Sequence, residues 1–309
     1  MNPAVKPPDQ VFIVGCGDIG TRVARLWLAE DVPVTGLARH GDRLTAADIP
    51  AYPADLDDPT TLTDLPVEQA LIYYFAPPPP RGQNDPRMTR FLQAVDQQGR
   101  RPARMVYIST SGVYGDRQGG IVTEQAEPNP QVDRARRRYA AEQTLREWGQ
   151  KHAVPVIVLR VGGIYGPGRL PIKRLREQVP MIHEALAPQT NRIHAADLAA
   201  ICVAAARRGT PGAIYNVSDG NDSNMTQYFN TVADFLGLPR PPLIDMDAAR
   251  QTLSEGMLSY LGESRRMDTS RLRKELGIEL QYPTLQIGLE ATCQHDRDEV
   301  RETSRRRGL

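Results

Sequence analysis

The stretch VFIVGCGDIG, residues 11–20, decides the fold of this 309-residue chain. Its first four residues are apolar and predict a buried strand, and a GxGxxG pattern follows at once. Gly15 would permit a tight turn, Gly17 would let the backbone approach a pyrophosphate, and Gly20 would allow close packing of helix and strand. The free N–H groups of the next helix would face that anion. The stretch therefore predicts a dinucleotide-binding turn rather than a plain strand–helix connection.

Apolar runs alternate with amphipathic helical stretches through the first two-thirds of the chain. Continuous apolar strands, each followed by a helix, are typical of a parallel sheet that helices cover on both faces. Right-handed crossovers would connect these strands into a doubly wound α/β Rossmann fold. The segments that favour strands are 11–14, 34–38, 69–76, 104–110, 154–160 and 213–218.

The pattern changes after Arg160, where a stretch rich in glycine and proline begins, and from about residue 220 the segments are short and mixed. Such a change predicts a second, smaller domain. The divisions that we expect are a dinucleotide-binding domain of residues 9–164 plus 192–219, a smaller mixed substrate-binding domain of residues 165–191 plus 220–300, and flexible tails at residues 1–8 and 301–309.

Composition excludes several classes of protein. A formal net charge of +1 predicts no broad nucleic-acid-binding surface. The three cysteines, Cys16, Cys202 and Cys293, are too far apart for a disulfide framework or a CxxC metal site, and the five histidines are scattered. The N-terminus has no signal-peptide pattern, and no apolar run could span a bilayer. We expect a cytoplasmic protein without a metal, whose partner is a small molecule rather than nucleic acid or a membrane.

The residue after the second expected strand selects among nucleotide ligands. An acid there would bind the ribose hydroxyls of NAD, and S-adenosylmethionine sites often use one too. This strand ends GLARH, and Arg39 is a cation that suits a 2′-phosphate. The sequence therefore favours NADP(H) over NAD(H), and both over S-adenosylmethionine. The alternative is that Arg39 is an ordinary surface arginine.

Several stretches resemble the short-chain dehydrogenase/reductase superfamily in its extended or atypical branch, the NAD(P)-dependent epimerase/dehydratase group. They follow the family's order between about residues 10 and 290. The matching stretches are VGCGDIG (14–20), ADLDDP (54–59), YISTSGVYG (107–115), AAEQTL (140–145), VLRVGGIYGPGR (158–169), NRIHAADLA (191–199), YNVSDG (215–220) and MDTSRLRKELG (267–277). The glycine pattern is one residue shorter than the GxxGxxG usual in the extended branch, which indicates an atypical member.

The resemblance implies a Rossmann domain with a small substrate domain, a substrate such as a nucleotide sugar, and a possible homodimer through the helices of 86–97 and 133–150. The implied cofactor-binding residues are Gly15, Gly17, Asp18, Ile19, Gly20, Arg39, Asp55, Leu56, Ala76, Pro77 and Arg138. The implied substrate-binding residues are Ser111, Tyr114, Arg134, Tyr165, Arg169 and His194. Asp197 is expected to cap or orient the helix that follows it.

The implied catalytic residues come from two motifs. Counting back four residues from Tyr114 gives Thr110 as the hydroxyl that orients a substrate oxygen. The YxxxK helix of the family has two possible registers here. In one, Tyr139 is the acid–base group and Gln143 replaces the lysine, so no charge lowers the pKa of the phenol.

In the other register, which fits the AAE that follows, arginines replace both catalytic residues. Arg134 stands at the tyrosine position and Arg138 at the lysine position. Tyr139 is then rotated about 100° away from the groove. An arginine cannot donate the proton, but two arginines at i and i+4 on one helix face could bind a carboxylate or phosphate. The alternative is a solvated basic helix face.

Two hypotheses on function remain open. The first is an NADP(H)-dependent reductase, epimerase or dehydratase that acts on a nucleotide sugar or a similar polar carbonyl or alcohol. The second is a catalytically inactive sensor or scaffold that binds NADP(H), which the missing Tyr–Lys pair favours. A methyltransferase is disfavoured, because Arg39 stands where an acid is expected.

Overall fold

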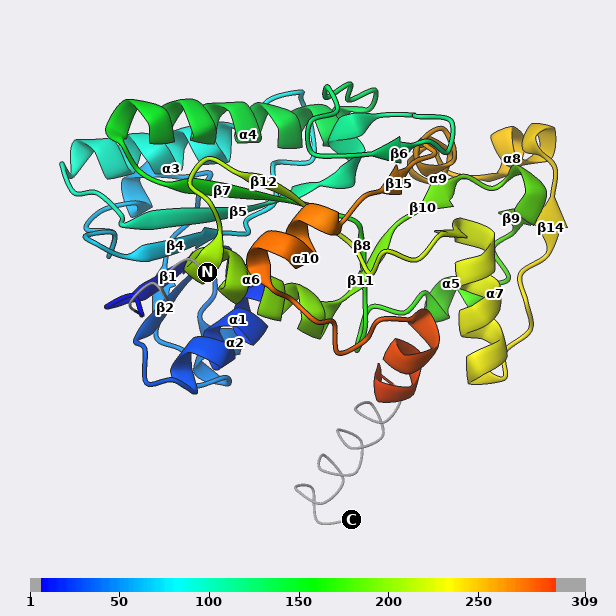
Figure 1. Ribbon diagram of the computed structural model, residues 1–309, viewed down its shortest axis with the longest axis horizontal. Coiled ribbons are helices and arrows are strands. Elements are labelled where there is room, and N and C mark those ends of the chain that lie inside the picture. The colour runs from blue at the N-terminus through cyan, green and yellow to red at the C-terminus, as the bar shows by residue number, and fades with distance from the viewer. Residues whose placement is uncertain (1–6, 293–309) are drawn as a thin grey trace, which may run out of the picture.

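The computed structural model describes residues 7–292 and contains one large parallel sheet. Its seven strands are ordered β3-β2-β1-β4-β5-β7-β12, and every neighbouring pair is parallel (Figure 1). The strands are β1 (Val11–Val14), β2 (Val34–Ala38), β3 (Ala51–Pro53), β4 (Leu71–Tyr74), β5 (Arg104–Thr110), β7 (Val156–Val161) and β12 (Ile214–Val217). The predicted doubly wound α/β fold is confirmed. Sequence analysis missed β3, because its three residues lie at the sheet edge without an apolar run.

Helices cover both faces of this sheet. Figure 1 shows α3 and α4 on one face and α1, α6 and α10 on the other. The helices are α1 (Asp18–Leu28), α2 (Asp42–Thr45), α3 (Pro86–Gln97), α4 (Asp133–His152), α6 (Ala195–Arg208) and α10 (Ser270–Leu276). Each face has its own apolar cluster, with Trp27 buried on one side and Phe91 on the other. Burial of apolar surface on both faces is what the near-continuous apolar strands require.

A smaller unit lies beyond the carboxyl ends of the strands, at the right of Figure 1. It has its own apolar cluster, which includes Leu175, Phe229, Val232, Met257 and Leu289. Its elements are α5 (Ile172–Arg176), β9 (Met181–Ile182), η3 (Glu184–Leu186), β10 (Gln189–Thr190), β13 (Ser223–Asn224), α7 (Met225–Leu236), β14 (Leu243–Ile244), α8 (Met246–Thr252) and α9 (Glu255–Leu261), with a last helical segment at 285–292.

The chain returns from this unit to the large sheet earlier than the predicted boundaries imply. Leu272 and Leu276 of α10 are buried in the main core beside α6 and β12. β15 (Arg266–Met267) pairs with β6 (Ile121–Val122), and β8 (Gly163–Tyr165) pairs with β11 (Arg192–His194). Assigning the whole of 220–300 to the substrate domain was therefore wrong, because the apolar face of α10 is buried against the Rossmann helices. The remaining elements are η1 (Pro59–Thr61) and η2 (Ser111–Tyr114).

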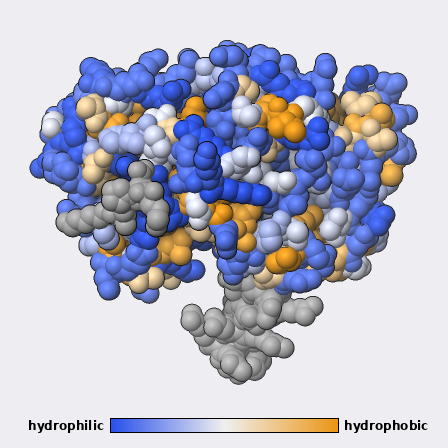
Figure 2. Space-filling view, in the orientation of Figure 1, coloured by the Kyte–Doolittle hydropathy of each residue, from blue (hydrophilic) through white to orange (hydrophobic). Residues whose placement is uncertain are grey.

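Other predicted features can be placed in the part of the chain that the structure describes. Within residues 7–292, no helix is long and apolar enough to cross a membrane, and no group of histidine, cysteine and acidic residues could hold a metal ion. Cys16 and Cys202 are buried free thiols, whereas Cys293 lies outside the described residues. The predicted tails also lie almost entirely outside them. Figure 2 shows a mainly hydrophilic face on which apolar residues form small separate groups.

Candidate functional site

The three glycines between β1 and α1 meet three different structural demands. Gly15 has φ +82°, and a Cβ there would lie 2.5 Å from the backbone of Ala76, so the turn requires glycine. A Cβ on Gly20 would lie 3.1 Å from Ile13 of β1, so this glycine lets helix and strand pack closely. The Cβ position of Gly17 has no neighbour within 4 Å, and no side chain caps the helix that follows. The first amides of α1 are therefore open to an anion such as a pyrophosphate.

The two residues between Gly17 and Gly20 differ in what they can offer a ligand. Ile19 is buried in the main core, so only its backbone is available. Asp18 Oδ1 accepts from Arg22 Nε at 2.8 Å, and its Oδ2 accepts from Arg169 Nε at 2.6 Å. Burial would raise the pKa of Asp18, but the hydrogen bonds and charges of both arginines outweigh it and lower that pKa. Asp18 is thus a carboxylate that ties α1 to the loop after β8.

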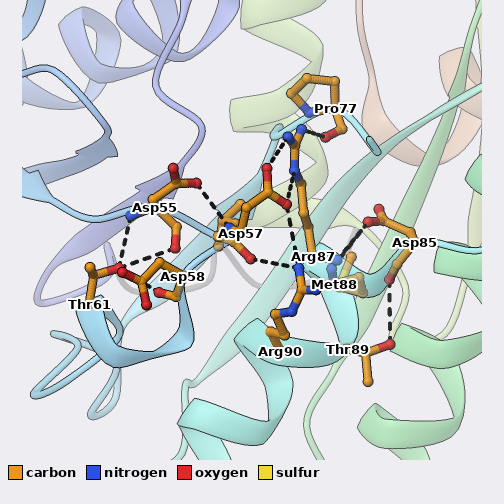
Figure 3. Close-up of polar contacts among 11 residues, drawn as sticks. Asp55, Asp57, Asp58, Thr61, Pro77, Asp85, Arg87, Met88, Thr89 and Arg90 are labelled. Carbon is orange, nitrogen blue, oxygen red and sulfur yellow. Dashed lines mark hydrogen bonds and ion pairs between the residues drawn. The ribbon is translucent and has the colours of Figure 1, made fainter. Parts of the chain in front are cut away.

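Arg87 of α3 ties together the loops after β3 and β4 through contacts drawn in Figure 3. Asp57 accepts from Arg87 Nε at 3.0 Å, and Arg87 Nη1 donates to the Pro77 carbonyl at 2.9 Å. The hydrogen bond from Arg87 is the main reason that the pKa of Asp57 lies below its usual value. Asp55 Oδ1 accepts from the Asp57 amide at 2.9 Å, and the next residue, Leu56, is buried in the core. This part of the candidate cofactor groove is consequently held by charged hydrogen bonds.

Arg39 follows β2 and is exposed. Within the described chain it forms no hydrogen bond or ion pair, although its charge contributes to the lowered pKa of Asp57. Its guanidinium therefore keeps all its donors for a ligand. Ala76, by contrast, is buried at the end of β4, where its amide donates to the Val14 carbonyl at 3.0 Å.

A cavity of about 930 Å³ opens at the carboxyl ends of β5 and β7. Cations dominate the charged residues among the described part of its lining: Arg134, Arg137, Arg138, Arg169, Lys173, Arg174, Arg192 and Arg265, against the one carboxylate of Glu263. The predicted site residues that line it are Pro77, Thr110, Ser111, Arg134, Arg138 and Arg169. The excess of positive charge suits a ligand with more than one negative charge.

The end of β5 presents hydroxyls to this cavity. Thr110 Oγ1 accepts from the Gly112 amide at 3.2 Å and thereby caps η2. Its own proton remains available for an oxygen of a bound molecule. Ser111 and Ser109 also line the cavity, and the Ser109 hydroxyl donates to Glu142 of α4. The Ser109 proton is therefore already used by a buried carboxylate, which makes Thr110 the better donor to a ligand.

Helix α4 presents arginines to the cavity and turns Tyr139 away from it. Arg138 Nη1 donates to the Ile108 carbonyl at 3.0 Å. Arg134 hydrogen-bonds Ser259, and its guanidinium lies 3.8 Å from the ring centroid of Tyr260. Tyr139 packs against an apolar cluster around Val113 and Met267 and does not line the cavity. Arg134 and Arg138 therefore line the cavity, whereas Tyr139 does not.

Two tyrosines expected to bind substrate lie outside the cavity. Tyr114 is fully buried, and its hydroxyl donates to Asn216 Oδ1 at 2.7 Å. Tyr165 is also buried, and its hydroxyl lies 3.4 Å from the carbonyl oxygen of Thr284. Burial raises the pKa of both phenols. Their assignment to substrate is therefore corrected, because packing beneath the site occupies both side chains.

His194 and Asp197 also bind the protein rather than a cavity ligand. His194 Nδ1 accepts from the Ala196 amide at 3.3 Å and so caps α6. Burial, and to a smaller degree the charge of Arg22, lowers the pKa of His194 to about 4. Asp197 does not cap the helix as expected: its carboxylate accepts from the amides of residues 281 and 282 at 2.8 and 3.0 Å. Asp197 thus fixes the C-terminal segment to α6.

Sequence analysis missed several charged residues in the cavity wall, among them Arg192 and Glu263. Arg192 is buried, and within residues 7–292 it donates only to neutral oxygens, those of Thr190, Ser223 and Asn224. Desolvation lowers the pKa of Arg192 to about 10. Its position two residues before His194, in a motif already singled out, was a usable signal. Glu263 follows α9 and binds Arg265 at 3.1 Å, and no sequence pattern marks it.

The fold and the glycine turn define the chain as a Rossmann-type dinucleotide-binding protein. Residues 11–218 match the NAD dependent epimerase/dehydratase family, and the chain belongs to that family. The predicted membership of the extended short-chain dehydrogenase/reductase superfamily is thereby confirmed.

Similar proteins span nearly the whole chain. The protein YeeZ of Escherichia coli strain K12 is 28% identical over 293 residues, which cover 89% of this chain and 96% of that protein. A conserved protein of unknown function from Silicibacter pomeroyi superposes with a TM-score of 0.78 at 28% identity, covering 94% of this chain and 99% of the other. The dTDP-glucose 4,6-dehydratase of Bacillus anthracis, solved in complex with NAD, gives a TM-score of 0.74 at 17% identity, covering 94% and 96%. This last similarity shows the fold alone.

Proposed function

We propose that this protein binds NADP(H) in preference to NAD(H) and acts as an epimerase, dehydratase or reductase on a nucleotide sugar or a similar polar carbonyl or alcohol. The cation-lined cavity at the carboxyl edge of the parallel sheet is the observation that carries the proposal. Ligands of doubly wound sheets bind at this edge. The negative charges of a pyrophosphate linked to a sugar would balance the positive charges of these arginines. The resemblance in fold to a dTDP-glucose 4,6-dehydratase supports the choice of a nucleotide sugar as substrate.

Residues of the glycine turn and of the two loops beside it would hold the cofactor. The open amides at the start of α1 would bind its pyrophosphate, and Arg39 would bind a 2′-phosphate. Asp55, Leu56, Ala76 and Pro77 would line the groove toward the adenine, and Arg138 would lie near the ribose of the nicotinamide. When bound, the nicotinamide exchanges a hydride with a carbon of the substrate.

Substrate orientation would depend on the hydroxyls and cations of the cavity. Thr110 would donate a hydrogen bond to the reacting oxygen, with Ser111 beside it, because its proton has no acceptor among the described residues. Arg134 would balance charge on the ligand. A guanidinium does not give up a proton near neutral pH, so neither Arg134 nor Arg138 replaces the acid–base tyrosine. Water in the cavity would transfer the proton.

The arginines on α4 also support the second candidate, a sensor or scaffold that binds NADP(H) without turnover. Nicotinamide fluorescence and absorbance separate the two candidates. An enzyme would change the redox state of the nicotinamide, in a single turnover or at steady state, with UDP-glucose or dTDP-glucose. A sensor would bind NADPH and show no such change. Absence of binding to both NADPH and NADH would refute both candidates.

Three further expectations accompany this function. We propose that the unit around Leu175 and Phe229 is the substrate domain, because it forms one wall of the cavity. We also propose a cytoplasmic location and a homodimer through α3 and α4. Size-exclusion chromatography with light scattering would test the dimer, and a monomeric mass would refute it.

A further inference from the structure

Arg169 connects the glycine turn to the cavity. It lies in the loop between β8 and α5 and lines the cavity, yet its Nε lies 2.6 Å from Asp18 Oδ2 in the first turn of α1. None of residues 15–20 lines the described cavity itself. Arg169 therefore links the two places where a dinucleotide would begin and end, the glycine turn and the cavity.

Asp18 places a negative charge where a pyrophosphate would bind. The N-terminal amides of α1 favour an anion, and the space at Gly17 lets one approach. The Asp18 side chain does not cap the helix, so it does not occupy the first amides of α1. Its carboxylate would repel a phosphate unless a cation neutralised it. Arg169 is that cation on the cavity side, and Arg22 contacts the other carboxylate oxygen from within the helix.

The ion pair is able to exchange partners. The side chains of Asp18 and Arg169 are 37% and 33% exposed, and ion pairs of such exposure are weak and readily opened. A pyrophosphate carries more charge than one carboxylate and accepts from several donors of a guanidinium at once. Within the described chain Arg169 uses only Nε toward Asp18, so both Nη groups remain available.

We propose that Arg169 binds the pyrophosphate of the dinucleotide cofactor, and that Asp18 holds its guanidinium in place until the cofactor arrives. The proposal rests on the proposed function, since it requires a dinucleotide at the glycine turn. It moves Arg169 from the substrate, to which the sequence assigned it, to the cofactor. If Arg169 binds the cofactor, cofactor binding also fixes the loop of residues 166–170, which forms part of the cavity wall.

The two partners of this ion pair predict effects of opposite sign. Arg169→Met removes a charged hydrogen bond to the pyrophosphate, so the Kd values of NADPH and NADH should both rise about 10-fold. Asp18→Asn removes the repulsion and the competing partner of Arg169, so both Kd values should fall about 3-fold. A pair that only fastens the loop to α1 would instead weaken binding in both variants.

Nicotinamide fluorescence titration measures these constants, and thermal unfolding verifies that each variant folds. Arg22→Met is the matched comparison, because it removes the other cation from Asp18 without touching the cavity; the charge that it leaves on Asp18 should raise both Kd values by no more than about twofold. Adenosine 2′-monophosphate, which lacks a pyrophosphate, should displace NADPH with the same Kd in wild type and Arg169→Met.

The measured Kd values decide between the proposal and its alternatives. Opposite signs with an unchanged Kd for the monophosphate support the proposal. If the wild type binds NADPH but both variants bind it more weakly, or neither variant changes the Kd, this proposal alone is overturned. A wild type that binds neither dinucleotide overturns the proposed function and this inference together.

Discussion

Replacing Arg160 tests the buried ion pair that supports the cavity from below. Arg160 Nη2 lies 2.8 Å from Glu142 Oε2, and the two side chains are 2% and 1% exposed. Ser109 donates to the same carboxylate, one residue before Thr110. Burial disfavours the charge on Arg160, but its hydrogen bonds and attraction to Glu142 outweigh that effect and raise its pKa. The pair thus joins β7, α4 and the end of β5.

Arg160→Met should lower the free energy of unfolding by about 3–5 kcal/mol, because it leaves the Glu142 carboxylate buried without a cation. It also removes the guanidinium that lies 4.7 Å from the ring centroid of Tyr114. The matched control is the double variant Glu142→Gln, Arg160→Met, which removes both charges of this pair. Its loss should be smaller than the sum of the two single losses by about 2 kcal/mol.

Urea unfolding followed by tryptophan fluorescence measures these free energies, since both tryptophans, Trp27 and Trp148, lie in helices against the large sheet. If Arg160→Met costs less than about 1 kcal/mol, or if the double variant loses the full sum, the pair is not an isolated buried charge pair. The inference that this pair supports the end of β5, and with it Thr110, would then be refuted.

Three other variants test the site. Arg39→Ala should raise the Kd of NADPH about 10-fold and leave that of NADH nearly unchanged in fluorescence titrations, since only NADPH carries the 2′-phosphate; equal losses would remove Arg39 from this role. Tyr139→Phe should leave any turnover within about twofold, because the side chain packs outside the cavity; a loss of several hundredfold in kcat would restore Tyr139 as the acid–base group. His194→Asn should keep a cap on α6 and remove a titration. The pKa of His194 falls from 6.5 to about 4 on folding, so wild-type stability should decline as pH drops from about 6.5 toward 4, by up to about 1.4 kcal/mol per pH unit. Urea unfolding across that range should give a shallower decline for the variant, and parallel curves would contradict the assignment.

The strand–glycine–helix pattern at residues 11–20 was sufficient to predict the first crossover, because each glycine meets a local demand. The left-handed φ of Gly15 and the contact of Gly20 with Ile13 depend on neighbours that any strand–turn–helix unit supplies. The positions of the central strands followed from the apolar runs for the same reason, whereas their order in the sheet came from the structure. Local patterns failed at the sheet edge, where β3 has no buried run.

Sequence alone determined the Rossmann class, the family resemblance and the two arginine positions on α4, since those depend on turn chemistry and helical periodicity. Only the tertiary structure decided which polar residues meet. Tyr114, Tyr165 and His194 belong to recognisable motifs but are buried against the protein, whereas Glu263 carries no motif and lines the cavity. Asp18 and Arg169 meet across 151 residues of chain. Side-chain direction and long-range proximity arise from packing between elements, which no local pattern encodes.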